Sequence, residues 1–151
     1  MGILLIQENK KARFDYEILE TFEAGLVLTG SEVKSLRDKN VQLKDSFIVF
    51  QGADAYLQNA HIAPYKAGSY NNHEPERKRK LLMHRKELNN IFAALRERGL
   101  TCIPLKIYFK EGRAKLEIAL AKGRKTHDKR EAIKTRDVQS QLQKLKRRSR
   151  G

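Results

Sequence analysis

Residues 101–121 read TCIPLKIYFK-EG-RAKLEIALA, and this stretch decides the fold. Apolar and polar residues alternate through both of its halves, as they do in β-strands that bury one face. The halves flank Glu111-Gly112, a pair that suits a tight hairpin turn, though less well than Asn-Gly does. The stretch therefore predicts an antiparallel hairpin with strands at 101–110 and 113–121.

Shorter segments earlier in the chain also have the pattern of strands. Residues 16–22 alternate, and residues 26–29 form a short apolar run that suits a buried strand. Residues 46–50 and 55–58 flank a loop at 51–54 whose length is typical of a hairpin. Together with the hairpin at 101–121, these segments predict about six short strands.

Two segments have the pattern of helices. The clearer one carries apolar residues at i, i+3, i+4 and i+7, with Gly99 as its C-terminal cap; these residues are Leu88, Ile91, Phe92 and Leu95. The shorter one spans 30–37, with Ser31 as its cap and Val33 and Leu36 facing inward. Strands around one solid helix predict a mainly β fold with peripheral helices, namely a small OB-like β-barrel.

Positive charge is concentrated near the C-terminus. The chain has 32 Lys and Arg residues against 18 acidic ones, a formal net charge of +14. Residues 122–151 hold 12 of those basic residues, 3 of the acidic ones and few large apolar side chains. Such a segment cannot bury enough surface to fold alone. We therefore expect a folded domain at 1–121 and a basic tail at 122–151.

The high positive charge predicts a polyanionic binding partner, and the sequence indicates no catalytic activity. No apolar run approaches the length of a membrane span, and the first residues lack the features of a signal peptide, so a cytoplasmic protein without membrane contact is expected. The four histidines form no metal-binding pattern, and no catalytic motif is present. The single cysteine, Cys102, is expected to be a buried hydrophobe rather than a reactive thiol. We predict no enzyme activity, metal or cofactor.

Four segments combine basic residues with polar or aromatic ones, at 9–13, 32–37, 77–84 and 122–130. Lys and Arg neutralise phosphates, and aromatic rings stack on bases. Any one segment could be no more than a solvated face, and the long polar loop at 66–80 could be merely mobile. Four of them on so basic a chain favour nucleic acid, and the absence of a recognition-helix motif leans toward RNA.

The same segments carry a family resemblance over residues 7 to 136. Five motifs resemble, in order, those of SsrA-binding proteins: Asn9-Lys-Lys-Ala12, Phe22-Glu-Ala-Gly-Leu26, Gly30-x-Glu-Val-Lys-Ser-Leu-Arg37, Arg79-Lys-Leu-Leu82 and Ala121-Lys-Gly-Arg-Lys-x-His-Asp-Lys-Arg130. Arg124 stands where Lys is commoner, which keeps the charge, and Met83-His84 varies a leucine-rich strand.

The resemblance implies an OB-like barrel that binds the tRNA-like domain of tmRNA (SsrA RNA) and delivers it to stalled ribosomes. Trans-translation would then tag the nascent chain and rescue the ribosome. The tail, disordered when free and helical on the ribosome, would sense the empty mRNA channel near the decoding centre. The implied partners are tmRNA, the ribosome with its 16S rRNA, and elongation factor Tu through the tmRNA complex, with the protein acting as a monomer.

The resemblance and the basic segments together give the expected site residues. For the tmRNA surface these are Asn9, Lys10, Lys11, Arg13, Glu23, Glu32, Lys34, Arg37, Arg79, Lys80, His84, Lys122, Gly123, Arg124 and Lys125. For the decoding-centre tail they are His127, Asp128, Lys129, Arg130, Lys134 and Arg136. Glu23 and Glu32 would either accept hydrogen bonds from RNA or hold nearby arginines. The alternative function is a structural ribosomal or ribosome-assembly protein bound to rRNA.

Overall fold

The computed structural model describes residues 2–65 and 72–123. Within these ranges the chain forms, in order, β1 (Ile3–Glu8), α1 (Lys10–Asp15), β2 (Tyr16–Leu26), α2 (Gly30–Arg37), β3 (Val41–Gln42), β4 (Phe47–Gln51), β5 (Asp54–Gln58), β6 (His61–Ile62), β7 (Arg79–Leu82), α3 (Arg85–Glu97), β8 (Thr101–Lys110) and β9 (Arg113–Gly123). The described ranges therefore hold nine strands, three more than the sequence pattern suggested.

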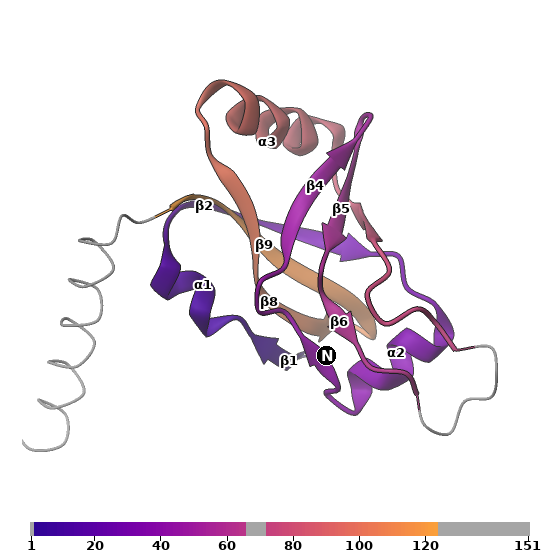
Figure 1. The fold of residues 1–151 in the computed structure, drawn as a ribbon. Helices are drawn as coiled ribbons and strands as arrows, with labels where there is room; N and C mark the ends of the chain where they lie inside the picture. The colour runs from indigo at the N-terminus through magenta and orange to yellow at the C-terminus, as the bar shows by residue number, and fades with distance from the viewer. Residues whose placement is uncertain (1, 66–71, 124–151) are drawn as a thin grey trace, which may run out of the picture.

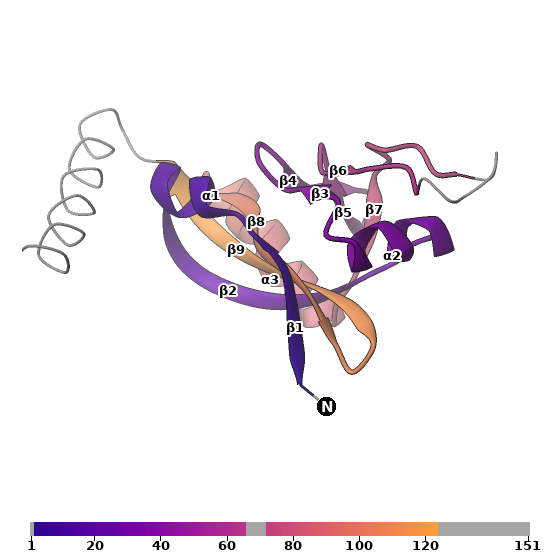
Figure 2. The ribbon, with the colours of Figure 1, turned by 90° about the horizontal axis from the view of Figure 1, so that it is seen from below.

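Seven strands form one antiparallel sheet in the order β1-β8-β9-β2-β7-β5-β4, and β3 pairs with β6 separately. The sheet curls strongly, as β2 shows in Figure 2, and its last strand β4 comes back against β8 (Figure 1). Leu88, Ile91 and Ala94 of α3 pack into the main core inside this curl. The prediction of a small, mainly β barrel with peripheral helices is confirmed.

The hairpin that decides the fold is present as β8 and β9, with strand bounds close to those expected. Both turn residues adopt positive φ, Glu111 at 52° and Gly112 at 77°, which is the conformation that fits the twist of a two-residue hairpin. A register shift between Pro104 and Lys106 changes which side chains face inward. Ile103 and Leu105 consequently pack on a second, smaller core beneath α1.

The separate strand predicted at 26–29 is wrong, because β2 runs without a break from Tyr16 to Leu26. Gly25 does not end the strand but pairs with Lys115 of β9 on one side and Leu82 of β7 on the other. A Cβ added at Gly25 would lie 3.4 Å from the Cβ of Leu82. Glycine is therefore needed here because the backbone of β7 approaches closely, which is a common reason for glycine inside a strand.

The short helix at 30–37 is confirmed, but its predicted cap is wrong. Thr29, not Ser31, caps α2: its Oγ1 accepts a hydrogen bond from the Glu32 amide, and its own amide donates to Glu32 Oε1 at 2.8 Å. This reciprocal arrangement is a capping box. The Ser31 hydroxyl instead lies 2.8 Å from Nδ1 of His73. The sequence pattern of a capping box, with Thr29 followed three residues later by Glu32, would have identified the cap.

Most of the other predicted elements are confirmed, and one predicted boundary is wrong. The β4–β5 hairpin, α3 and the buried Cys102 are confirmed, and Gly99 ends α3 at φ 64°. The loop predicted at 66–80 is too long at its C-terminal end, because Arg79 and Lys80 already belong to β7. No helix within the described ranges has both the length and the apolar character of a membrane span.

Candidate functional site

Helix α1 presents three cations at one end of the barrel. Asn9 caps the helix, since its Oδ1 accepts from the Ala12 amide at 3.3 Å and its Nδ2 donates to the Pro104 carbonyl at 3.0 Å. The Asn9 side chain is buried and committed to these backbone groups, whereas Lys10, Lys11 and Arg13 are exposed. In this structure Asn9 therefore positions the cations of α1 and presents no free surface itself.

The last residues of β9 lie beside α1. Gly123 pairs with Tyr16 and Lys122 with Glu17, so β9 finishes at the point where α1 passes into β2. The structure thus brings Lys122 and Gly123 to the same end as the cations of α1. The predicted residues beyond Gly123 fall outside the described ranges: Arg124, Lys125, His127, Asp128, Lys129, Arg130, Lys134 and Arg136.

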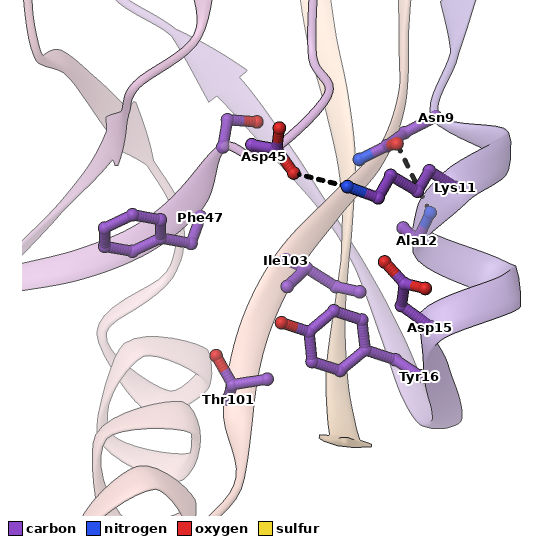
Figure 3. A pocket seen from close by; sticks show the side chains of 10 residues that line it. Asn9, Lys11, Ala12, Asp15, Tyr16, Asp45, Phe47, Thr101 and Ile103 are labelled. Carbon is purple, nitrogen blue, oxygen red and sulfur yellow. Dashed lines mark hydrogen bonds and ion pairs between the residues drawn. The ribbon is translucent and has the colours of Figure 1, made fainter. Parts of the chain in front are cut away.

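A cavity of about 220 Å³ opens under α1, between the helix, the start of β4 and the start of β8 (Figure 3). Two aromatic residues, Tyr16 and Phe47, line it, and Lys11 and Asp45 form an ion pair of 2.9 Å at its rim. The hydrogen bond to Asp45 raises the pKa of Lys11, and the same bond lowers the pKa of Asp45. Because both side chains are exposed, this pair is weak and easily exchanged for a phosphate.

A second group lies around α2, where Glu32 is the buried centre. Arg79 Nε donates to Glu32 Oε2 at 2.7 Å, and both side chains have no exposed surface. Arg77, about one-third exposed, donates to Glu32 Oε1 at 2.6 Å. Arg79 also donates hydrogen bonds to the carbonyls of Ala60, Glu74 and Pro75. Glu32 was expected either to accept hydrogen bonds from RNA or to hold nearby arginines, and in this structure it holds Arg77 and Arg79.

This network also fixes the charge of Glu32. Burial alone would raise the pKa of the carboxyl, but hydrogen bonds from Arg77, the Thr29 amide and Arg79 outweigh burial and lower it. Glu32 is consequently ionised at neutral pH and ties α2 to β7 and to the segment that precedes β7. Neither Glu32 nor Arg79 has surface to offer a ligand in this arrangement, so both act as supports.

The cations that α2 does expose are Lys34 and Arg37. Lys34 Nζ lies 5.6 Å from the ring centre of Tyr65, and the Arg37 guanidinium lies 6.0 Å from that of Phe109. Each ring thus attracts the charged end of the side chain above it and helps to orient that cation. Arg37 thereby sits next to the tip of the β8–β9 hairpin, which joins α2 and the hairpin into one basic region.

Glu23 belongs to this second region and is held there by hydrogen bonding. The Tyr108 hydroxyl donates to its Oε2, which lowers the pKa of Glu23, and Lys110 Nζ lies 3.5 Å from the same oxygen. A cleft of about 390 Å³ beside it is lined by Glu23, Lys110, Glu111, Arg113 and Lys115. The sequence reasoning missed these hairpin cations, although alternation alone puts Arg113 and Lys115 on one face of β9.

The other predicted residues lie away from both groups. Lys80 is exposed on β7, 3.8 Å from Asp54, and His84 is the exposed cap residue of α3. Two apolar residues near them, Val27 and Leu82, are 42% and 55% exposed and were not singled out from the sequence. Their exposure departs from the usual burial of such side chains, so Leu82 of β7 and Val27, just after β2, form an apolar feature of the surface.

The predicted residues therefore form two separated groups rather than one patch. Figure 1 shows α1 and the end of β9 on one side of the barrel and α2 on the other, and Figure 2 shows the same separation from below. Within the described ranges, no group of three or more His, Cys, Asp and Glu side chains could hold a metal ion. What the arrangement offers is exposed cations, aromatic rings and rigid supports, which suits phosphates and bases.

Comparison with known proteins agrees with this chemistry. The model of the family described as SmpB protein matches residues 6–148. An SsrA-binding protein of Bdellovibrio bacteriovorus is 74% identical over 149 residues, covering 99% of this chain and 98% of that one. An SsrA-binding protein of a Sulfurihydrogenibium species is 52% identical over 144 residues, covering 95% of each chain.

A solved structure gives the same answer for the fold. One of its chains superposes with a TM-score of 0.69 and 51% sequence identity, covering 84% of this chain and 93% of that one. That structure is described as "tmRNA-SmpB: a journey to the center of the bacterial ribosome".

Proposed function

The chain belongs to the SmpB family of SsrA-binding proteins, and we propose that it binds the tRNA-like domain of tmRNA and delivers it to stalled ribosomes for trans-translation. The observation that carries this proposal is the family match over residues 6–148, which spans both basic ends of the barrel and reaches into the basic tail. The protein acts as a cytoplasmic RNA-binding monomer, and elongation factor Tu joins it through tmRNA.

The geometry supports a binding role in which the body is a rigid scaffold. Exposed cations on α1 and α2 are mounted on helices whose caps and buried partners fix their positions. Neutralising phosphates in this way gives affinity that falls steeply with salt. Asn9, Glu32 and Arg79 contribute by holding the two helices, so their substitution would weaken RNA binding through the fold.

The tail, from residue 124 onward, is proposed to enter the vacant mRNA channel and to become helical there. Eleven of the 32 basic residues lie in residues 124–151, and mRNA would compete with them for the same cation-binding path. Asp128, Lys129 and Arg130 are proposed to lie near the decoding centre. Because β9 pairs with β2 as far as Gly123, two residues beyond the expected boundary at 121, we place the start of the tail at residue 124.

The test is deletion of residues 124–151, with the affinity for tmRNA and the rate of nascent-chain tagging measured separately. We expect tmRNA affinity to be largely kept and tagging to be abolished. A second variant, Asp128→Ala with Lys129→Ala and Arg130→Ala, should impair tagging while the thermal unfolding transition of the barrel stays in place. Tagging at the normal rate by the deletion variant would contradict the role given to the tail.

The rival is a structural ribosomal protein that binds rRNA permanently. Pull-down of the tagged protein from a bacterial lysate at moderately high salt, followed by sequencing of the bound RNA, separates the two. One dominant RNA with a tRNA-like end supports the proposal. A broad mixture of rRNA fragments, or salt-resistant sedimentation with all ribosomes, supports the rival.

A further inference from the structure

A groove of about 260 Å³ lies between α3 and the β4–β5 hairpin, away from both basic ends described above. Phe50, Gly52 and Ala53 line it from the hairpin, and Arg85, Leu88, Asn89 and Phe92 line it from the helix. Figure 1 shows these elements side by side at the top of the barrel. None of the residues expected to contact tmRNA lines this groove.

Helix α3 carries a stripe of four side chains of three chemical kinds (two guanidinium groups, an amide and an aromatic ring), and three of the four line the groove. Arg85, Asn89, Phe92 and Arg96 follow one another at intervals of four, three and four residues, so they share one face of α3. All four are exposed, and Phe92 keeps 38% of its surface in solvent. A phenylalanine this exposed on a helix that buries Leu88, Ile91 and Ala94 elsewhere is a surface feature and not a core residue.

The ring of Phe92 is held in place from two sides. The Phe50 ring meets it edge-on, with centroids 5.2 Å apart and planes at 65°, and the Arg96 guanidinium lies 5.6 Å from its centre. Arg85 is anchored by a hydrogen bond of 2.8 Å to the Ala53 carbonyl. The groove thus presents a preoriented aromatic ring with Arg85 and the Asn89 amide in its lining, and Arg96 flanks the ring one turn further along α3.

These four groups fit one kind of occupant, an unpaired nucleotide. An aromatic ring stacks on a base of any sequence, and arginines on either side of it neutralise the phosphates that flank that base. An amide donates and accepts, as the edge of a base does. Among the residues that line the groove the only charge is the positive charge of Arg85, and Asp54, which does not line the groove, lies 4.0 Å from it.

We propose that this groove binds a single unpaired nucleotide of RNA, with its base on Phe92, its edge at Asn89 and its neighbouring phosphates at Arg85 and Arg96. The inference rests on the proposed function, since that supplies two sources of RNA: tmRNA itself and the ribosomal RNA. The binding chemistry is the same for both sources, and the test has an arm for each.

The test is photo-crosslinking with the full chain. Asn89→Cys is labelled with a benzophenone maleimide, and Asn90→Cys, also exposed but not lining the groove, is the matched control on the same helix. The native Cys102 is fully buried and does not compete for the label. Each labelled protein is irradiated with tmRNA transcript alone in one arm and with tmRNA and 70S ribosomes in the other.

We expect the Asn89 probe to crosslink to one or two adjacent nucleotides of tmRNA or of rRNA, well above the Asn90 probe. Phe92→Leu, which keeps an apolar side chain against Phe50 but removes the flat ring, should lower that crosslink and weaken RNA binding at least about fivefold, the lower end of the stacking effect. Arg96→Gln, on the exposed face of the helix, should lower both without affecting folding.

Equal RNA crosslinking by the two probes in both arms, or crosslinking of the Asn89 probe to a protein, would overturn the proposal. In that case tmRNA binding by the unlabelled protein would show that the proposed function still stands. If the unlabelled protein fails to bind tmRNA, the proposed function fails instead, and a specific crosslink to rRNA in the ribosome arm would still support the groove.

Discussion

Replacing Glu32 by Gln should cost this protein a large part of its stability. Gln keeps a carbonyl oxygen that can accept the Thr29 amide, so the capping box survives in part. What Gln removes is the charge that compensates Arg79, whose side chain has no exposed surface. It also places an N–H group among the donors of Arg77 and Arg79.

The size of the effect follows from burial. Breaking a buried ion pair by removing one partner costs about 3–5 kcal/mol, because the other charge is left without compensation in a medium of low dielectric. The total stability of a domain is about 5–15 kcal/mol, so the variant loses about a fifth or more of it. At about 2–4 °C per kcal/mol for a chain of this size, the melting temperature should fall by about 6–20 °C.

The assay is urea unfolding of the full chain followed by circular dichroism, since the sequence has no Trp to report by fluorescence. Lys11→Met is the matched control: it breaks an ion pair of 2.9 Å whose partners are 45% and 68% exposed, and it should cost less than about 1 kcal/mol. If Glu32→Gln costs no more than Lys11→Met, the reasoning from burial is refuted.

Three further effects follow from the same structure. Folding lowers the pKa values of Glu32 and Glu23, so their contribution to stability is complete above the unfolded pKa of about 4.3 and is lost as the pH falls below that value. The urea concentration at the unfolding midpoint should therefore fall between pH 6 and pH 3. It should fall less steeply with pH in Glu32→Gln, which lacks one of the two carboxyl groups. Burial raises the pKa of Cys102 to about 12, so a thiol reagent at pH 8 should react with it only on unfolding, and rapid labelling of the native protein would contradict its burial. Gly99→Ala should lower the stability by about 1 kcal/mol because residue 99 has φ 64°. Gly30→Ala should be neutral or stabilising, because residue 30 has open space around it and no positive φ. Equal changes in melting temperature for the two variants would refute the explanation from backbone conformation.

The local patterns in the sequence predicted the local structure well and the long-range structure less well. Alternation around Glu111-Gly112 and the spacing of Leu88, Ile91 and Leu95 are properties of adjacent residues, and the β8–β9 hairpin and α3 are present as expected. The alternating segment was expected at 16–22, whereas β2 continues through Gly25, which contacts Leu82 of β7, 57 residues later in the chain. No pattern within residues 23–29 could reveal that contact.

The structure places several of the predicted site residues where the sequence pattern did not suggest. Arg79 looked like one more cation of a basic loop, but pairing of β7 with β2 and β5 carries it into the interior, where it meets Glu32. Its partner lies 47 residues earlier, so the sequence offered no sign that the two neutralise each other. Conversely, Arg113 and Lys115 lie at the tip of a hairpin that the sequence reasoning treated as core alone.

The two basic ends are separated by the geometry of one strand. α1 ends at Asp15 and β2 starts at Tyr16, while three residues separate the end of β2 at Leu26 from the start of α2 at Gly30. Eleven residues of strand span about 35 Å along their path, and pairing with β9 from Tyr16 to Gly25 stiffens that path. The paired strand β2 therefore holds the cations of the two ends at a fixed spacing. An extended RNA fold presents phosphates at fixed spacings too, so rigid separation of the two ends gives selectivity for shape that a flexible basic chain of the same charge cannot provide.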